Sequence, residues 1–263
     1  MRLKALAQWN QTLSDWERFL SASPEGCFVA ECDGAAVGTA TTILYARRFA
    51  WIGMVLVDPG YRGQGIGTAL LERAIQHVDS RHVVAARLDA TPQGKPLYQK
   101  LGFVAEYAIE RWMLERLSGN RARGEISRDI DDVFPLDREV FGADRSALLR
   151  SLAAAAPEFA LVAKRAGGVV GYAFGRHGSL GDHLGPWVAR DEAVAADVLD
   201  EFLRRSARGV VFVDCVQRSP WGVPLVQARG FRVSRLLTRM FRGANEYPGR
   251  PELLGAVLGP EFG

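Results

Sequence analysis

A glycine-rich segment that begins at Arg62 holds residue types that could bind an anion. It reads Arg-Gly-Gln-Gly-Ile-Gly-Thr, and it follows an apolar stretch that Pro59 interrupts. Because glycine lacks a Cβ, successive backbone N–H groups can point into one concavity. The N-terminus of a following helix adds about half a positive charge. Such a turn fits a pyrophosphate, although a glycine loop can also serve only to pack a helix against a sheet.

Two other nucleotide-binding motifs fit this segment less well. A Rossmann fingerprint requires its glycines directly after the strand and a third glycine where Thr68 stands. Asp89 follows at a suitable distance for the ribose-binding acid of that motif, but residues 58–62 separate the expected strand from the glycines. A phosphate loop requires Gly-Lys-Ser/Thr, and Gly67 is followed directly by Thr68. We therefore expect neither a dinucleotide-dependent enzyme nor an NTPase.

Apolar periodicity and turn residues predict the elements that would position the segment. Leu3 to Leu20 has apolar residues at three- and four-residue steps, which predicts one or two opening helices. The elements expected after them are a hairpin of strands 27–32 and 36–44, a strand 51–57, a helix 68–78, a strand 83–88, a helix 95–100 and a strand 103–114. The glycine-rich segment would then join a strand to a helix.

The same order of elements recurs later in the chain. Residues 28–38 match 161–171 at a constant offset of 133, and 96–103 match 224–231 at an offset of 128. The stretch 117–125 between the copies is polar, contains glycine and has no apolar period, as interdomain linkers do. The chain has 263 residues, which is more than one compact domain usually holds. We therefore expect domains at 1–118 and 127–263 with a linker at 119–126.

Composition excludes several classes of protein. Hydrophobic residues make up 48% and charged residues 24%, which is ordinary globular usage. A net charge of +3 predicts neither a nucleic-acid nor a membrane partner. No apolar run reaches the roughly 18 residues of a membrane span, and the three cysteines form no CxxC pair, so we expect a cytoplasmic protein. The four histidines lack metal-ligand spacing, and no metal site is expected.

The glycine-rich segment that begins at Arg62 resembles motif A of the GNAT N-acetyltransferase superfamily. Arg62, Gly65 and Gly67 match its Q/R-x-x-G-x-G/A pattern, and Tyr98 to Phe103 matches its Y-x-x-x-G-F segment. The resemblance covers residues 13–117 well and the second half as a degenerate copy. It implies an α/β (α+β) fold of two GNAT-like domains in tandem, each a mixed, twisted β-sheet flanked by helices.

The resemblance also implies that acetyl-CoA is the co-substrate and lies between the splayed strands 51–57 and 83–88. The pantetheine arm would bind the first of these strands, and the pyrophosphate would bind the glycine-rich turn. The cofactor-binding residues implied in this way are Val55, Leu56, Val57, Arg62, Gly63, Gln64, Gly65, Ile66, Gly67 and Thr68.

Tyr98 matches the family's general acid, which would protonate the leaving thiolate. An unperturbed phenol has a pKa of about 10 and so carries a proton at neutral pH; the same residue could instead only pack its short helix. A backbone N–H at or near Val57 would meet the oxyanion. The general base stays open, with Asp89, Glu31 and His77 as candidates.

The second half has neither a glycine cradle nor the phenol, because Val226 stands where the first copy has Tyr98. We expect it to be catalytically silent and favour a role as one wall of the acceptor pocket, with a dimer surface or a regulatory site as alternatives. The sequence thus predicts an N-acetyltransferase that acts on a primary amine of a small molecule or peptide, with a homodimer allowed. The alternative is an acyl-CoA-binding sensor without turnover.

Overall fold

The computed structural model describes residues 1–117 and 130–263, so the expected linker at 119–126 lies outside the described residues. The first half follows the predicted order of elements closely. Its helices and strands are α1 (Arg2–Leu6), α2 (Leu13–Ala22), β1 (Cys27–Cys32), β2 (Ala35–Tyr45), β3 (Phe49–Val57), α3 (Ile66–Ser80), β4 (Ala85–Ala90), α4 (Lys95–Lys100) and β5 (Val104–Glu115). The predicted strand 83–88 begins two residues late, at Ala85.

The second half repeats that order, as the sequence matches predict. Its helices and strands are α5 (Phe134–Phe141), α6 (Ser146–Ala155), β6 (Leu161–Arg165), β7 (Gly168–His177), β8 (Asp182–Ala189), α7 (Glu192–Arg205), β9 (Val210–Val216), α8 (Gly222–Ala228), β10 (Arg232–Gly243) and β11 (Leu254–Ala256). The α/β class is confirmed, with one large mixed sheet flanked by helices.

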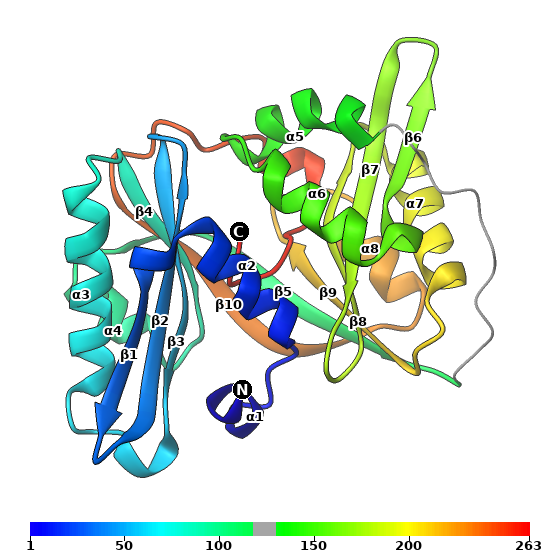
Figure 1. The fold of residues 1–263 in the computed structure, drawn as a ribbon. Helices are drawn as coiled ribbons and strands as arrows, with labels where there is room; N and C mark the ends of the chain where they lie inside the picture. Colours follow the sequence, from blue (N-terminus) through cyan, green and yellow to red (C-terminus); the bar gives the residue numbers. More distant parts are fainter. Residues whose placement is uncertain (118–129) are drawn as a thin grey trace.

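The two halves exchange their last long strands. The strand order is β1-β2-β3-β4-β10-β5-β9-β11-β8-β7-β6, so β10 of the second half lies between β4 and β5 of the first. Strand β5 in turn pairs with β9 along residues 109–115. Figure 1 shows β10 and β5 running side by side from one half of the molecule to the other. One continuous sheet therefore joins the two halves.

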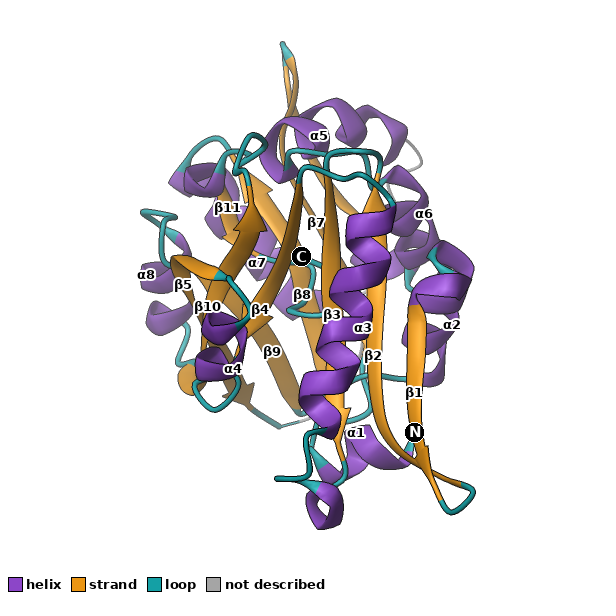
Figure 2. Ribbon diagram, turned by 90° about the vertical axis from the view of Figure 1, so that its left-hand side faces the viewer, coloured by secondary structure: helices purple, strands orange, loops and turns teal. Residues whose placement is uncertain are grey.

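In the first half, β3 and β4 separate after a short parallel pairing. They pair only from Phe49 to Trp51 on β3, although β3 continues to Val57. Met54 has a φ of 50°, the register with β2 shifts beside it, and Thr39 donates a hydrogen bond to its carbonyl at 2.9 Å. This bulge bends β3 away from β4, which leaves one backbone edge of β3 without a partner strand. In Figure 2, α3 lies across the sheet face formed by β2 and β3.

In the second half, the corresponding gap is filled by the chain itself. Strands β8 and β9 pair in parallel only at residues 182–184, and β11 then enters between them. Gly185 allows this approach, because a Cβ there would lie 2.0 Å from the carbonyl oxygen of Val257. The C-terminal tail then continues to Gly263 and packs against Trp51 of β3. The tail therefore contacts both halves of the molecule.

Candidate active site

A groove follows the open edge of β3 and the start of α3. Its volume is about 900 Å³. All but one of the predicted cofactor-binding residues line it, namely Val55, Leu56, Val57, Arg62, Gly63, Gly65, Ile66, Gly67 and Thr68; Gln64 does not. Leu6, Ala7 and Trp9 of the N-terminal segment line it as well. The structure thus brings the strand and the glycine-rich turn to one concave surface, and the binding role of these residues stays a prediction.

The glycine-rich turn depends on backbone angles that glycine adopts easily. Gly63 has a φ of +76° and Gly65 a φ of +81°, and the space where a Cβ would lie is open at both. Gly65 is the N-cap of α3 and supplies no side chain to the first-turn amides. Those amides have no intrahelical acceptor, so they remain available to an anion at the positive end of the helix dipole. The turn is held in place by Arg62, whose Nε donates to the carbonyl of Val57 at 3.2 Å.

Tyr98 lies where this groove meets a second, smaller pocket. The residue lines both, and its ring packs edge-on to Phe103 with 6.1 Å between ring centroids. Burial raises the pKa of the phenol to about 12. The hydroxyl is therefore protonated throughout the neutral range, as a proton donor must be.

The smaller pocket combines residues from both halves of the chain. Strand β3 contributes Gly53 and Met54, the N-terminal segment Trp9 and Gln11, strand β10 Arg235 and Leu237, and the C-terminal tail Pro260 and Glu261. Gly53 is required there, because a Cβ would lie 2.6 Å from the carbonyl oxygen of Glu261. An acceptor bound in this pocket would meet Tyr98 at the junction with the groove.

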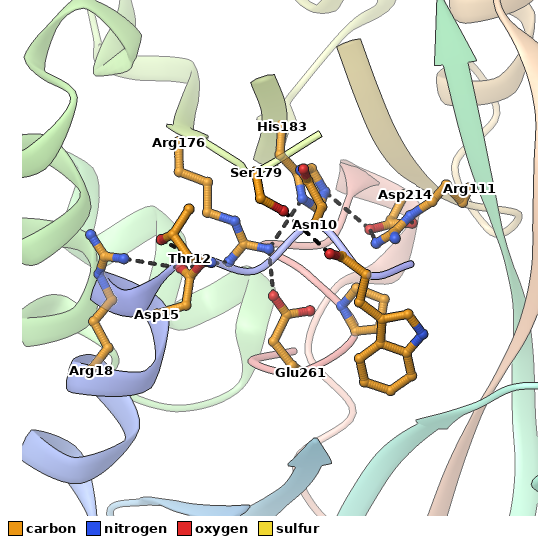
Figure 3. A network of polar contacts seen from close by, with 12 residues as sticks. Asn10, Thr12, Asp15, Arg18, Arg111, Arg176, Ser179, His183, Asp214 and Glu261 are labelled. Atoms are coloured by element: carbon orange, nitrogen blue, oxygen red, sulfur yellow. Dashed lines mark hydrogen bonds and ion pairs between the residues drawn. The ribbon is translucent and has the colours of Figure 1, made fainter. Parts of the chain in front are cut away.

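Buried charges beside this pocket form ion pairs that join distant parts of the chain. Asp89 accepts two hydrogen bonds of 2.9 Å from Arg239 on β10. Arg111 on β5 donates to both carboxylate oxygens of Asp214 on β9, at 2.8 and 2.7 Å. Figure 3 shows the adjoining network, in which Arg176 donates to Glu261 of the tail.

The same network anchors the N-terminal segment. Arg176 approaches Asp15 of α2 at 3.5 Å, and Asp15 also pairs with Arg18 at 3.0 Å. Asn10 accepts from the amide of Leu180 at 2.8 Å and donates to the carbonyl of Gly181 at 3.1 Å. The N-terminal segment, the second half and the tail are therefore fixed relative to one another at the pocket.

The structure separates the three candidates for the general base. Asp89 lines the smaller pocket, but Arg239 engages both of its carboxylate oxygens. Glu31 is exposed on β1. His77 is buried in α3 against Phe28, with 5.8 Å between ring centroids, and burial lowers its pKa. Glu31 and His77 line neither the groove nor the pocket.

Sequence reasoning missed the pocket residues that come from the second half and the tail. Pro260 and Glu261 belong to no motif, and no local pattern in the sequence gives their partners. Arg235 lies in a segment with several arginines and carries no motif. The exchange of β10 into the first half brings Arg235 to the site, and no local pattern reports such an exchange.

The described residues of the second half differ from the first at the positions that correspond to the groove. Its gap between β8 and β9 holds β11, and Val226 of α8 is fully buried where a phenol would be needed. Across residues 1–117 and 130–263, no three side chains of His, Cys, Asp or Glu gather in a way that could hold a metal. None of the helices in these ranges is long and apolar enough to cross a membrane.

Two family models match the chain in succession. The acetyltransferase (GNAT) family model matches residues 4–103, and a model of an acetyltransferase (GNAT) domain matches residues 133–254. A holothin acyltransferase of Pseudoalteromonas sp. is 28% identical over 261 residues, which are 97% of this chain and 87% of that protein. An uncharacterized N-acetyltransferase of Bacillus subtilis, YitH, is 29% identical over 58% of this chain and 55% of its own length.

Solved structures share the arrangement over nearly the whole chain. A candidate acetyltransferase of Pyrococcus horikoshii superposes with a TM-score of 0.79 and 26% identity, covering 95% of this chain and 84% of that one. A tandem GNAT protein from the clavulanic acid biosynthesis pathway superposes with a TM-score of 0.60 at 16% identity, covering 92% and 93%. The second likeness concerns the fold alone.

Proposed function

We propose, because this chain belongs to the GNAT superfamily of acyl-CoA-dependent N-acyltransferases and carries two of its domains in tandem, that it transfers an acetyl group from acetyl-CoA to a primary amine. The observation that carries the proposal is the groove of the first half, where an unpaired strand edge and a glycine-rich helix N-terminus share one surface with Tyr98.

The residues present fit acetyl-CoA, the co-substrate of the family. The amides of the Gly63–Thr68 turn would hold the pyrophosphate, and the open edge of β3 at Val55–Val57 would hydrogen-bond the pantetheine arm as an added strand does. When bound, the co-substrate supplies the activated acyl group. A backbone N–H at or near Val57 would stabilise the oxyanion formed on attack.

Tyr98 would donate the proton that the leaving sulfur requires. Its phenol lies at the junction of the groove and the pocket and remains protonated because burial raises its pKa. A thiol leaves more readily than a thiolate in an apolar environment, where an anion is poorly solvated. General acid catalysis of this kind contributes about 10²–10⁴ in rate.

Glu261 would accept the proton of the attacking amine. The pocket is lined by two carboxylates, of which Asp89 has both oxygens engaged by Arg239. Glu261 is 4% exposed; its Oε1 accepts from Arg176, and within residues 1–117 and 130–263 no hydrogen-bond donor reaches its Oε2. This oxygen is therefore the one carboxylate atom of the pocket lining left to contact an ammonium group or an intervening water.

We assign the acetyl-CoA site to the domain at 1–118 and a supporting role to the domain at 127–263. The second domain would wall the acceptor pocket through β10 and the tail, which supply Arg235, Leu237 and Glu261. We place the reaction in the cytoplasm, since Cys27, Cys32 and Cys215 are all free thiols and acyl transfer needs no oxidising environment.

Calorimetric titration of acetyl-CoA tests the assignment of the groove. Wild type should bind near one equivalent per chain, because β11 fills the second gap. Gly65→Glu should abolish binding, since it places a carboxylate beside the pyrophosphate site. Gly34→Glu is the matched control: Gly34 also has a positive φ, of +74°, and open space around its Cβ position, but lies in the β1–β2 turn.

Equal binding by wild type and a folded Gly65→Glu variant would contradict the assignment, and so would two equivalents per chain.

The Tyr98→Phe variant distinguishes an enzyme from a sensor of acyl-CoA. A sensor would keep its full affinity for acetyl-CoA and has no turnover to lose. An enzyme would keep its affinity for acetyl-CoA but lose catalytic rate.

A further inference from the structure

Arg235 holds a guanidinium at the junction of the groove and the acceptor pocket, and it lines both. It lies on β10 opposite Arg111 of β5, three residues before Thr238, which pairs with Ala90, the last residue of β4. The side chain therefore projects from a part of β10 that β4 no longer covers. Tyr98 and Thr91 line the same two cavities.

Arg235 lacks the counter-charge that the other ionisable residues of the pocket have. Asp89 is paired with Arg239, Arg111 with Asp214, and Glu261 with Arg176. In the described ranges 1–117 and 130–263, Arg235 makes neither an ion pair nor a hydrogen bond through its guanidinium, although it is only partly exposed. The lining itself holds two guanidinium groups and two carboxylates, and Arg235 is the one of these four charges that no ion pair within the described residues neutralises.

This unpaired positive charge destabilises the protein when no anion is bound. Burial, and next the neighbouring Arg111, lowers the pKa of Arg235, and the carboxylate of Asp214, which Arg111 already engages, opposes this to a smaller extent. A partly desolvated cation beside a second arginine is stabilised when an anion replaces the lost water. A guanidinium presents two parallel N–H donors that match a carboxylate in a bidentate pair.

We infer that Arg235 binds a carboxylate of the reacting molecule, and that the acceptor is a primary amine which also carries a carboxylate. The lining offers matching chemistry for such a molecule: Leu237 and Pro260 provide apolar surface, and Glu261 provides an acceptor for the ammonium group. The inference rests on the proposed function, which places an acceptor in this pocket. The same carboxylate could instead belong to the acyl chain of the donor, and the experiment distinguishes these two sources.

The acceptor arm uses product analogues, so it does not depend on finding the natural substrate. N-acetyl-L-leucine and N-(3-methylbutyl)acetamide differ only by the carboxylate. Each is titrated calorimetrically into the full chain saturated with CoA. Wild type should bind the acid at least about tenfold more tightly. Arg235→Gln should lose this preference, and Arg232→Gln, on an exposed residue of the same strand, should keep it.

The donor arm compares succinyl-CoA with acetyl-CoA on the same three proteins. A preference for succinyl-CoA that only Arg235→Gln removes would assign the carboxylate to the acyl chain and overturn the acceptor assignment. If neither arm shows a carboxylate preference that depends on Arg235, the inference is wrong while acetyl-CoA binding, and with it the proposed function, stands. If wild type does not bind acetyl-CoA, the proposed function itself fails.

Discussion

At the scale of single residues, the site depends on side chains whose neighbours set their protonation or leave an atom unpaired. Tyr98 is held against Phe103, and burial raises its pKa to about 12. Glu261 keeps one oxygen toward Arg176 and leaves the other without a donor from the described part of the chain. These two residues could give and accept the two protons that acyl transfer to an amine must move.

Replacing Tyr98 by phenylalanine should lower kcat by about 10²-fold or more and leave the affinity for acetyl-CoA unchanged, because the ring packing is retained. Tyr61→Phe, on another tyrosine that lines the groove, is the control and should stay near wild type. In wild type, kcat should not fall up to about pH 10, where a phenol with an ordinary pKa would be half ionised. A rate unaffected by Tyr98→Phe would remove the residue from the mechanism.

Glu261→Gln should lower kcat/KM by about 10²-fold, because the amide cannot accept the amine proton. The amide oxygen can still accept from Arg176, so the melting temperature should change little. The loss should shrink as pH rises and the free amine becomes more abundant. Steady-state kinetics from pH 6.5 to 9.5, about the range in which a primary amine begins to deprotonate, would show this. A pH-independent loss would indicate a purely structural role.

At the scale of elements, the bulge in β3 and the strand β10 create the site together. The bulge at Met54 opens the edge of β3, and β10 supplies Arg239, which holds Asp89 at the end of β4. The guanidinium of Arg239 also lies over the ring of Trp51, 4.5 Å from its centroid, and donates to the hydroxyl of Tyr107 at 2.7 Å. This one side chain therefore links β3, β4, β5 and β10.

Arg239→Met should destabilise the protein by about 3–5 kcal/mol, because it leaves the Asp89 carboxylate buried without a partner. Urea unfolding measures this difference. Arg242→Met is the matched control on the same strand: it removes an ion pair with Asp79 at 2.9 Å whose side chains are 35% and 52% exposed. Its cost should be below about 1 kcal/mol. Comparable losses of unfolding free energy in the two variants would mean that the buried Arg239–Asp89 pair does not stabilise the packing of β10 against β4.

At the scale of the whole molecule, the two halves form one interleaved unit. Strand β5 lies between β10 and β9, strand β10 lies between β4 and β5, and the tail passes from the gap of the second half to β3 of the first. Removal of either half would expose long unpaired strand edges in the other. The smaller pocket, which we propose binds the acceptor and which needs β3, β10 and the tail, would also be lost.

Fragments 1–117 and 130–263 should therefore copurify as a stable complex when they are expressed together. Each expressed alone should aggregate or remain unfolded, because its sheet lacks the exchanged strand. Size-exclusion chromatography and circular dichroism would test this. Two separately folded, monomeric fragments that do not associate would show that each half completes its own sheet.

The sequence by itself determined much of the first half. The order of elements, the glycine-rich turn and the position of Tyr98 are local properties, since periodicity, turn residues and short motifs report what neighbouring residues do. The constant offsets at 28–38 and 96–103 likewise revealed the duplicated order of elements. The absence of a glycine cradle in the second half was also readable, because it needs no knowledge of contacts.

Only the tertiary structure decided which distant residues meet at the acceptor pocket. Arg235 reaches the pocket that Tyr98 lines through the exchange of β10, and Glu261 reaches it through the return of the tail. Both events are set by sheet pairing and by close backbone approaches at Gly53 and Gly185. Such contacts join residues far apart in the sequence, since Gly53 and Glu261 are 208 positions apart and Gly185 and Val257 are 72 apart (261−53 and 257−185), and a single sequence carries no periodic signal for them.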